Sequence, residues 1–469
     1  MDKIKMIFSL GSLGFLLDGA ALAQAPVTIT ATGSKAPGFE VPADFTGWSF
    51  ETQSILPGAN GKYLFSPANQ PLIALFQTLG IKTLRIGGNT ADRPGVPVPG
   101  SADIDTLFAF ARAADVKVIY TLRLRDGSVT NAAPLAKYIE QHYPSQLACF
   151  AIGNEPNFYF ETYAAYRDEW KKYTAAITAE VPNAKFCGPS AGGKPVWARD
   201  FANELGKSEP IAFIAQHDYP CGNGIQATNI TAARDKMLSP KLLDGYQTLW
   251  RSFAPAALSN GLPFRLEEAN NFYNAGAKDV SDTFASALWG LDFLHWWAAH
   301  DASGVNFHTG DKVAAGSATR SCWYATFWSA DQGYDIHPIG YAIKAFNLGS
   351  HGHVEPLTIS NPDGINLTAY AIRDGGNLFV TIIDKDHGPG AKAVKVTIVS
   401  PGISEHAAVI FLSAPDNNLA AKTGVTLGGA SLNDHGWDGK WTPLTLDQPG
   451  QCTLDVPASS AAIVRLSLK

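Results

Sequence analysis

Short apolar segments with the composition of β-strands alternate with helical stretches through most of this chain. The stretches between them, such as residues 104–114 and 162–181, carry apolar residues at intervals of three and four, which is the helical period. This alternation favours a parallel sheet with crossover helices, and eight units fit a closed (β/α)₈ barrel better than an open doubly wound sheet. The eight strand candidates are residues 45–50, 83–86, 116–122, 147–152, 185–188, 213–219, 263–268 and 304–308.

The helical period ends near residue 347, and short alternating strands separated by turn residues follow it. This pattern is typical of an all-β antiparallel sandwich. A further alternating segment, residues 27–32, precedes the first barrel strand, and we expect it to complete the sandwich. The sequence therefore predicts an N-terminal strand segment in residues 24–44, a catalytic barrel in residues 45–346 and an appended sandwich in residues 347–469.

The N-terminus has the features of a secretory signal peptide in residues 1–23. A basic start is followed by an apolar run, residues 6–17, and by the small-residue cleavage site Ala21-Leu22-Ala23. The run is short for a membrane span. We therefore predict an exported protein, periplasmic or secreted, without membrane contact after signal removal. The 5 cysteines are few and odd in number, so the sequence leaves their disulfide status open.

Composition and motifs exclude several other classes of function. The net charge of −6 and the lack of a Lys/Arg cluster argue against nucleic acid as a partner. No Gly-x-Gly-x-x-Gly run follows a predicted strand, so no dinucleotide cofactor is expected. His217 and His308 stand at strand ends, but a third ligand at a known spacing is missing, so no metal is expected.

Carboxylates follow two of the predicted strands. Glu155 comes directly after the fourth strand, in Gly153-Asn154-Glu155-Pro156, and Glu267 and Glu268 end the seventh. The C-terminal ends of barrel strands meet at one rim, where barrel enzymes carry their active sites. Glycoside hydrolysis needs such a pair, one carboxyl group protonated and the other ionised. Because side chains alternate along a strand, only one of Glu267 and Glu268 is expected to face the cleft, and alternation does not select which.

Further motifs occur at the other strand ends, in the same order along the chain. They are Gly47-Trp48-Ser49-Phe50-Glu51, the run from Leu84 to Asp92 that contains Arg85 and Asn89, His217-Asp218-Tyr219, and Glu268 followed by Tyr273 and Gly276. Together with the Gly153-Asn154-Glu155-Pro156 motif, this set resembles glycoside hydrolase family 79 of clan A, the family of bacterial β-glucuronidases and heparanase. The resemblance covers the whole barrel, and the appended sandwich matches the family's architecture.

The resemblance implies a retaining, exo-acting β-glucuronidase that needs no cofactor and acts on a glucuronide glycan or glycoside. Glu155 would be the general acid/base and Glu268 the nucleophile, while Asn154 would bind the sugar 2-hydroxyl. Arg85 is expected below the carboxylates, where its charge would keep one of them ionised. Glu267 would then pair with Arg265 or Arg123, or would support the site without touching the sugar.

The resemblance also implies a set of substrate-binding residues. Tyr219 would hold the nucleophile, and Glu51 and Asn89 would bind hydroxyls of the terminal sugar. The uronate would be held by hydroxyl groups and backbone N–H groups of Tyr273, Ala275, Gly276 and Tyr324.

The family's usual run in this loop is Tyr followed by three glycines, where this chain has Tyr273-Asn274-Ala275-Gly276. Asn tolerates a positive φ better than most residues, and Ala does not share this property. The alternatives are therefore another clan A β-glycosidase, such as a β-xylosidase or β-glucosidase, and a non-catalytic carbohydrate-binding protein.

Overall fold

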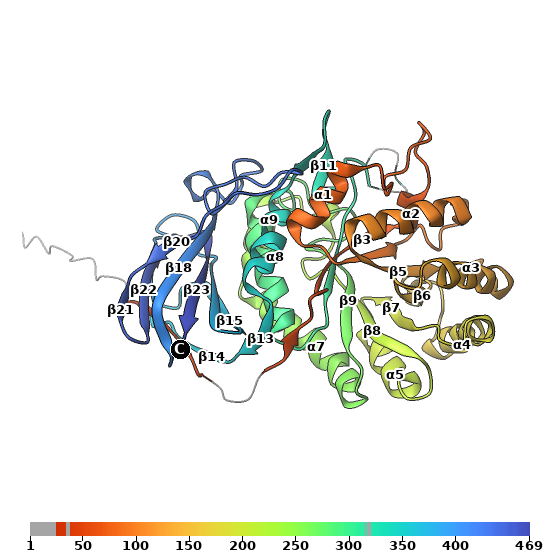
Figure 1. Ribbon diagram of the computed structural model, residues 1–469, viewed down its shortest axis with the longest axis horizontal. Helices are drawn as coiled ribbons and strands as arrows, with labels where there is room; N and C mark the ends of the chain where they lie inside the picture. Colours follow the sequence, from red (N-terminus) through yellow and green to blue (C-terminus); the bar gives the residue numbers. More distant parts are fainter. Residues whose placement is uncertain (1–24, 34–37, 315–316, 318–319) are drawn as a thin grey trace, which may run out of the picture.

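The computed structural model describes residues 25–33, 38–314, 317 and 320–469 (Figure 1). Residues 1–23, for which the sequence predicts a signal peptide, lie outside the described residues, so export stays a prediction. In the described part of the chain, no helix combines the length and the apolar character that a membrane crossing requires.

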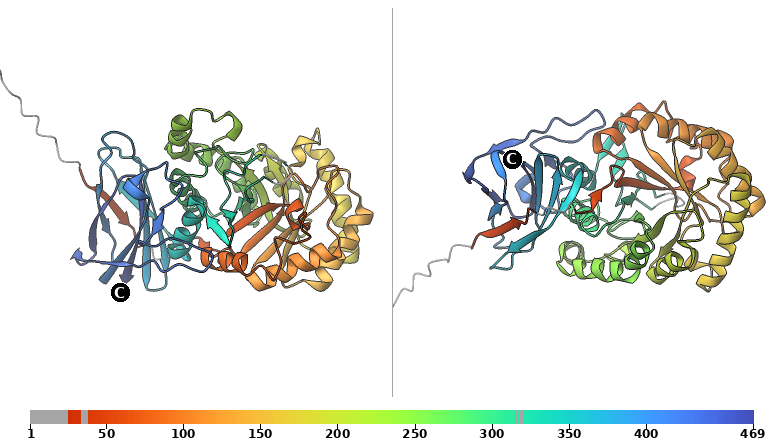
Figure 2. Two further views of the ribbon diagram at one scale, coloured as in Figure 1. Left: turned by 90° about the horizontal axis from the view of Figure 1, so that it is seen from above. Right: turned by 60° about the horizontal axis from the view of Figure 1, so that its bottom comes forward.

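Eight parallel strands close into a barrel, which confirms the predicted fold (Figure 2). The strands follow one another around the barrel in chain order, and β10 closes it against β3. Most of their residues are buried because the helices cover the outer face and side chains fill the interior. The strands are β3 (Thr46–Glu51), β4 (Thr83–Gly87), β5 (Lys117–Leu122), β6 (Leu147–Ile152), β7 (Phe186–Gly192), β8 (Ile211–Asp218), β9 (Phe264–Ala269) and β10 (Val305–His308).

Helices surround the barrel, as Figure 1 shows. The first helix carries ordinary capping signals at both ends: the Asn69 side chain accepts from the backbone N–H of Leu72 at its start, and Gly80 ends it with φ 79°. The helices are α1 (Gln70–Leu79), α2 (Ser101–Ala114), α3 (Val129–His142), α4 (Tyr163–Glu180), α5 (Pro195–Leu205), α6 (Ile230–Leu238), α7 (Lys241–Ser259), α8 (Phe284–Ala298) and α9 (Pro338–Gly349).

Two facing sheets form the sandwich beside the barrel (Figure 1). As expected, the segment before the barrel joins it: β1 (Val27–Ala31) pairs with β14 (Leu357–Ser360) and, in parallel, with β17 (Val394–Val399). The other pairings of these sheets are antiparallel. The remaining strands of the sandwich are β2 (Glu40–Val41), β13 (Gly352–Glu355), β15 (Leu367–Asp374), β16 (Asn377–Asp384), β18 (Ile403–Ser413), β19 (Thr426–Leu427), β20 (Thr442–Leu444), β21 (Leu446–Gln448), β22 (Gln451–Val456) and β23 (Ser460–Leu468).

The helix α8 lies between barrel and sandwich, and all of its residues are buried. A helix can be apolar all round only when neighbours cover every side. Its Asp292 accepts hydrogen bonds of 2.7 Å from Thr368 and Tyr370 of β15 and lies 2.5 Å from the Lys385 ammonium group. A buried ion pair with further hydrogen bonds therefore joins the two parts of the molecule.

The cysteines are all buried and free. Cys149 and Cys187 lie on neighbouring strands, β6 and β7, in an apolar cluster with Ala151 and Ala215. They pack there as small apolar residues, so no disulfide contributes to the stability of this fold.

Candidate active site

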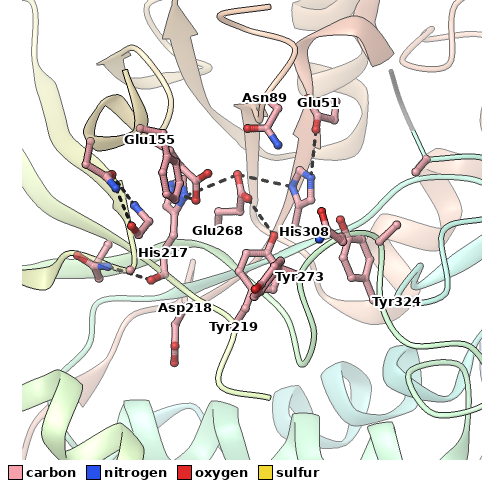
Figure 3. A pocket seen from close by; sticks show the side chains of 18 of the residues that line it. Glu51, Asn89, Glu155, His217, Asp218, Tyr219, Glu268, Tyr273, His308 and Tyr324 are labelled. Carbon is pink, nitrogen blue, oxygen red and sulfur yellow. Dashed lines mark hydrogen bonds and ion pairs between the residues drawn. The ribbon is translucent and has the colours of Figure 1, made fainter. Parts of the chain in front are cut away.

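A cavity of about 860 Å³ opens at the C-terminal ends of the barrel strands (Figure 3). Two of the residues predicted for the site lie outside its lining: Asn154 lines a smaller adjoining cavity, and Gly276 lines another. The predicted site residues that line the main cavity are Glu51, Asn89, Glu155, Tyr219, Glu268, Tyr273, Ala275 and Tyr324.

Glu268 lies at the end of β9 with both carboxylate oxygens occupied. Arg85 donates to Oε2 at 2.6 Å, and the Tyr219 hydroxyl donates to Oε1 at 2.9 Å. Burial alone would raise the pKa of this carboxyl group, but the surrounding cations, first His308 and His217, outweigh burial and hold the pKa well below its usual range. Glu268 is therefore an oriented, ionised carboxylate, the state that a nucleophile requires.

Glu155 follows β6 in a left-handed backbone conformation, with φ 46°. Its N–H donates to the Ser190 carbonyl at 2.9 Å, and its Oε1 lies 3.1 Å from Nδ1 of His217. The backbone at Gly192 packs against the Glu155 carboxylate: a Cβ added to Gly192 would lie 2.2 Å from Oε1 of Glu155. One oxygen each of Glu155 and Glu268, with a ring nitrogen of His217, lie within 4.8 Å of one another. The fold therefore brings the two predicted carboxylates to one point.

Only one of the two carboxylates at the end of β9 faces the cleft, as expected: Glu268 lines the cavity, and the fully buried Glu267 does not. The Oε1 of Glu267 lies 4.0 Å from Nη2 of Arg85 and 3.4 Å from Nε2 of His217. The register shifts there, since Gln216 and His217 of β8 pair with Leu266 and Glu268, and Glu267 is the extra residue. Such a bulge redirects side chains, so simple alternation fails.

Neither arginine considered as a partner pairs with Glu267, which leaves the alternative that it supports the site without touching the sugar. Arg265 donates to Asn306 and to backbone carbonyls at the opposite end of the strands, and Arg123 donates to the carbonyls of Ala91 and Val96. Both guanidinium groups are held in these bonds, so Arg85 is the arginine that Glu267 meets.

Arg85 and Asp92 fix the residues around the carboxylates. Arg85 also donates to Oδ1 of Asn154 at 2.7 Å. Asp92 accepts from the backbone N–H of Asn154 at 2.7 Å and from Leu124 at 2.7 Å, so it ties the ends of β4, β5 and β6 together. The side-chain amide of Asn154 donates to Asn89 at 3.4 Å, which places two predicted sugar-binding residues side by side.

On the other side of Glu268, Glu51 and His308 form a second polar group, as Figure 3 shows. Oε2 of Glu51 accepts from the N–H and the hydroxyl of Thr90, both at 2.7 Å. His308 lies 3.7 Å from Glu51 and 3.9 Å from Glu268. The chain turns sharply beside them at Gly88, which has φ 65° and where a Cβ would lie 2.5 Å from the Glu51 carboxylate. Glycine is therefore required there.

The loop after β9 keeps the path that three glycines would allow. Asn274, Ala275 and Gly276 have φ values of 63°, 68° and 84°. The carbonyl of Ala275 accepts from the N–H of Trp323 at 2.7 Å, and a Cβ on Gly276 would lie 2.7 Å from the N of Tyr324. Ala275 thus adopts a left-handed conformation that costs an alanine about 1–2 kcal/mol.

Glu155, His217 and Glu268 each offer one ligand atom, so their fit to a metal ion can be tested. Both oxygens of Glu268 already accept hydrogen bonds, from Arg85 and Tyr219. A divalent ion would have to displace a guanidinium group at 2.6 Å or stand beside its charge. The arrangement fits a pair of catalytic carboxylates better than a metal site.

Sequence reasoning placed His217 at the rim as a polar residue that orients the carboxylates and left a supporting role open for Glu267, but it gave Asp92 no role. His217 and Asp92 stood in recognised motifs, which was the available signal. For Glu267 the sequence gave no signal beyond its position, because the bulge that turns its side chain inward cannot be recognised from the sequence.

The fold and the carboxylate pair define a (β/α)₈-barrel glycoside hydrolase. The structure of a 4-O-α-L-rhamnosyl-β-D-glucuronidase from Fusarium oxysporum matches with a TM-score of 0.72 and 18% identity, over 93% of this chain and 99% of that one. A GH51 arabinofuranosidase from Xanthomonas axonopodis pv. citri matches with a TM-score of 0.66 and 13% identity, over 94% and 100%. At these identities the similarity shows the shared fold.

Within that class, the resemblance to glycoside hydrolase family 79 is confirmed. Residues 369–463 match the family model described as the glycosyl hydrolase family 79 C-terminal beta domain. A beta-glucuronidase from Aspergillus niger is 25% identical over 374 residues, which are 68% of this chain and 67% of that protein. The sandwich is thus similar to the C-terminal domain of this family, and most of the chain is similar to a beta-glucuronidase.

Proposed function

We propose that this protein is a retaining, exo-acting β-glucuronidase. The observation that carries the mechanism is the approach of Glu155 and Glu268, whose nearest oxygens lie within 4.8 Å. Retaining glycosidases hold their carboxyl groups about 5–5.5 Å apart, whereas inverting enzymes need about 6.5–9.5 Å to admit a water molecule. An approach this close supports the retaining mechanism over the inverting one.

The two carboxylates divide the reaction into two displacements. Glu268 attacks the anomeric carbon while Glu155 gives its proton to the departing oxygen, which forms a glycosyl ester on Glu268 and releases the aglycone. Glu155 then takes a proton from water as the water oxygen attacks the same carbon and Glu268 leaves. Arg85 and Tyr219 hold Glu268 in place throughout, and they stabilise the carboxylate that departs in the second step.

The orientation of the sugar follows from the two sides of the cavity. The acid/base lies toward the leaving group, so the aglycone extends past Glu155, and the non-reducing end lies toward Glu51 and His308 (Figure 3). Tyr273, Tyr324 and the backbone of the positive-φ loop line the cavity as candidates to hold a uronate. The names of the Aspergillus and Fusarium proteins favour glucuronides as the substrate class.

Replacement of each carboxylate tests the mechanism. Glu268→Ala should lower the turnover of an aryl β-glucuronide by on the order of 10⁴-fold or more, because the nucleophile is gone. Azide should restore activity to this variant with inversion, as a small anion takes the place of the carboxylate. Glu155→Ala should lose about 10²–10⁴-fold, and azide should rescue it with retention. Near wild-type activity of Glu268→Ala would refute the assignment.

The sugar is tested separately by a panel of substrates. Aryl β-glucuronide, glucoside and xyloside should be compared on the wild-type enzyme, with product stereochemistry followed by NMR. Preference for the glucoside or xyloside would leave the proposed mechanism intact but change the proposed substrate class. The comparison is needed because Ala275 stands in the loop where the family has glycine. Binding of a glucuronide without hydrolysis would indicate a carbohydrate-binding protein instead.

A further inference from the structure

Glu267 is a buried carboxylate beneath the catalytic pair for which the two displacements give no task. Its side chain is fully buried, and Oε2 lies 3.5 Å from the thiol of Cys187. Its other oxygen, Oε1, faces Nε2 of His217 at 3.4 Å, and neither atom has a hydrogen-bond partner among the described residues. Burying a charge is costly unless a partner compensates it, so this pairing needs an explanation.

His217 connects this buried carboxylate to the acid/base. Its ring lies between the two, with Nε2 toward Glu267 and Nδ1 at 3.1 Å from Oε1 of Glu155. The ring is 1% exposed, so solvent does not compete for either nitrogen. A carboxylate beside one ring nitrogen favours the proton on that nitrogen, which fixes the tautomer and determines what the other nitrogen can do.

We propose that Glu267 is a positioning residue that acts through His217: it holds the Nε2 proton, so that Nδ1 shares a second proton with Glu155. In the free enzyme this second proton is on Nδ1, and imidazolium faces the Glu155 carboxylate. It moves from Nδ1 to Oε1 before the glycosidic bond breaks, which leaves a neutral ring that keeps its Nε2 proton. Glu155 then delivers it to the leaving oxygen as the C–O bond breaks.

The second half of the reaction returns the proton. Water gives one proton to Glu155 as its oxygen bonds to the anomeric carbon, and this proton passes from Oε1 back to Nδ1 of His217. Each turnover therefore consumes one water and leaves the relay as it began. The inference rests on the acid/base role proposed for Glu155.

The charges around His217 support a protonated ring. Burial alone would lower the pKa of His217, but the neighbouring carboxylates, first Glu268, raise it to about 9. The pKa of Glu267 is lowered, since Arg85 and His217 outweigh its burial. The charged and titratable groups that face the ring are Glu155 after β6 and Glu267 and Glu268 on β9, with Arg85 on β4, Cys187 on β7 and His308 on β10 in contact with those carboxylates.

The pH profile of kcat/KM on an aryl β-glucuronide tests the proposal with Glu267→Gln. This variant keeps the shape of the side chain and an acceptor oxygen but removes the charge. An opposite charge at this range shifts a pKa by about 1–3 units, so the alkaline limb should move to lower pH by that amount. A purely structural role would lower the whole profile without moving the limb. An alkaline limb at the wild-type pH would overturn the proposal.

Asp384→Asn is the matched control. Asp384 is also a fully buried carboxyl group with an unpaired oxygen, but it lies on β16 in the sandwich. Burial raises the pKa of Asp384 to about 7, so its replacement changes a comparably buried carboxyl group outside the site and should leave the alkaline limb where it is. An equal shift in both variants would count against a specific relay.

Nitrogen-15 NMR of histidine-labelled protein tests the relay without activity, so it separates failure of the relay from failure of the proposed function. The signal of His217 is assigned among the 11 histidines by its loss in His217→Gln. We expect a ring protonated on both nitrogens at pH 7 that titrates near 9 to the Nε2–H tautomer. A ring that is neutral at pH 7, or an Nδ1–H tautomer at high pH, would overturn the proposal even if Glu267→Gln does not fold.

Discussion

At the scale of single residues, Ala275 adopts a backbone conformation that alanine disfavours. Its φ of 68° lies in the left-handed region, between Asn274 and Gly276, which share that conformation. A contact from outside the loop stabilises this strained conformation: the N–H of Trp323 donates a hydrogen bond to the Ala275 carbonyl. An alanine in place of glycine therefore changes the stability of the loop more than its path.

Replacing this alanine by glycine should change stability little. Ala275→Gly relieves about 1–2 kcal/mol of backbone strain, loses about 0.8 kcal/mol of methyl burial and costs about 0.5–1 kcal/mol in the entropy of the unfolded chain, so the free energy of unfolding should stay nearly the same. Urea unfolding followed by tryptophan fluorescence measures the change. Ala277→Gly is the matched control: Ala277 is fully buried without a positive φ, and its replacement should cost about 1–2 kcal/mol. Similar losses in both variants would show that Ala275 is unstrained.

The positions of the two proposed catalytic carboxylates were predictable at this scale, because each lies at the C-terminal end of a strand of one parallel barrel. The directions in which the Glu267 and Glu268 side chains point relative to one another could not be predicted. Alternation is a rule for regular strands, and the bulge in β9 breaks it where the site is built.

At the scale of elements, the site depends on how neighbouring strand ends are joined. Asp92, in the loop after β4, accepts hydrogen bonds from Leu124 and Arg125 after β5 and from Asn154 after β6. It also accepts from the hydroxyl of Tyr159. A single buried carboxylate thereby fixes the loops that carry Asn154 and Glu155.

Removal of this link should damage both stability and activity. Asp92→Ala leaves buried N–H groups without acceptors, at about 1–3 kcal/mol each, so we expect a loss of at least about 3 kcal/mol in unfolding free energy. Turnover should fall because Asn154 and Glu155 lose their support. Glu161→Ala replaces an exposed carboxylate beyond the same loop and should change stability by less than about 0.5 kcal/mol. Equal unfolding midpoints for the two variants would contradict this role of Asp92.

At the scale of the whole molecule, barrel and sandwich are joined through α8 rather than through a flexible linker. The ion pair between Asp292 of α8 and Lys385 is almost fully buried, with side-chain exposures of 7% and 2%. Thr368 and Tyr370 of β15 complete the contacts of Asp292. We therefore expect the two parts to unfold together.

Breaking this pair should destabilise the whole chain. Asp292→Ala leaves the Lys385 charge buried without its partner, which costs about 3–5 kcal/mol. Differential scanning calorimetry should show a lower Tm, with the single transition split or broadened. Glu180→Ala removes the partner of Lys137 in an exposed pair and should change stability by less than about 0.5 kcal/mol. A Tm unchanged in Asp292→Ala would mean that the interface does not depend on this pair.

The sequence by itself determined the architecture and the two carboxylates. The barrel could be predicted because its eight strands are largely buried and most of its crossover helices are amphipathic, which are local patterns that the sequence shows. The sandwich could be predicted from alternation for the same reason. Glu155 and Glu268 followed because strand ends of a parallel barrel meet at one rim.

Only the tertiary structure decided how the charges in the site are paired. His217 meets Glu155 and Glu267, and Arg85 meets Glu268, across strands that are far apart in the chain. Such contacts depend on strand register, on the bulge at Glu267 and on the close approach allowed at Gly192. No local pattern encodes these features, because each is a distance between residues that only closure of the barrel brings together.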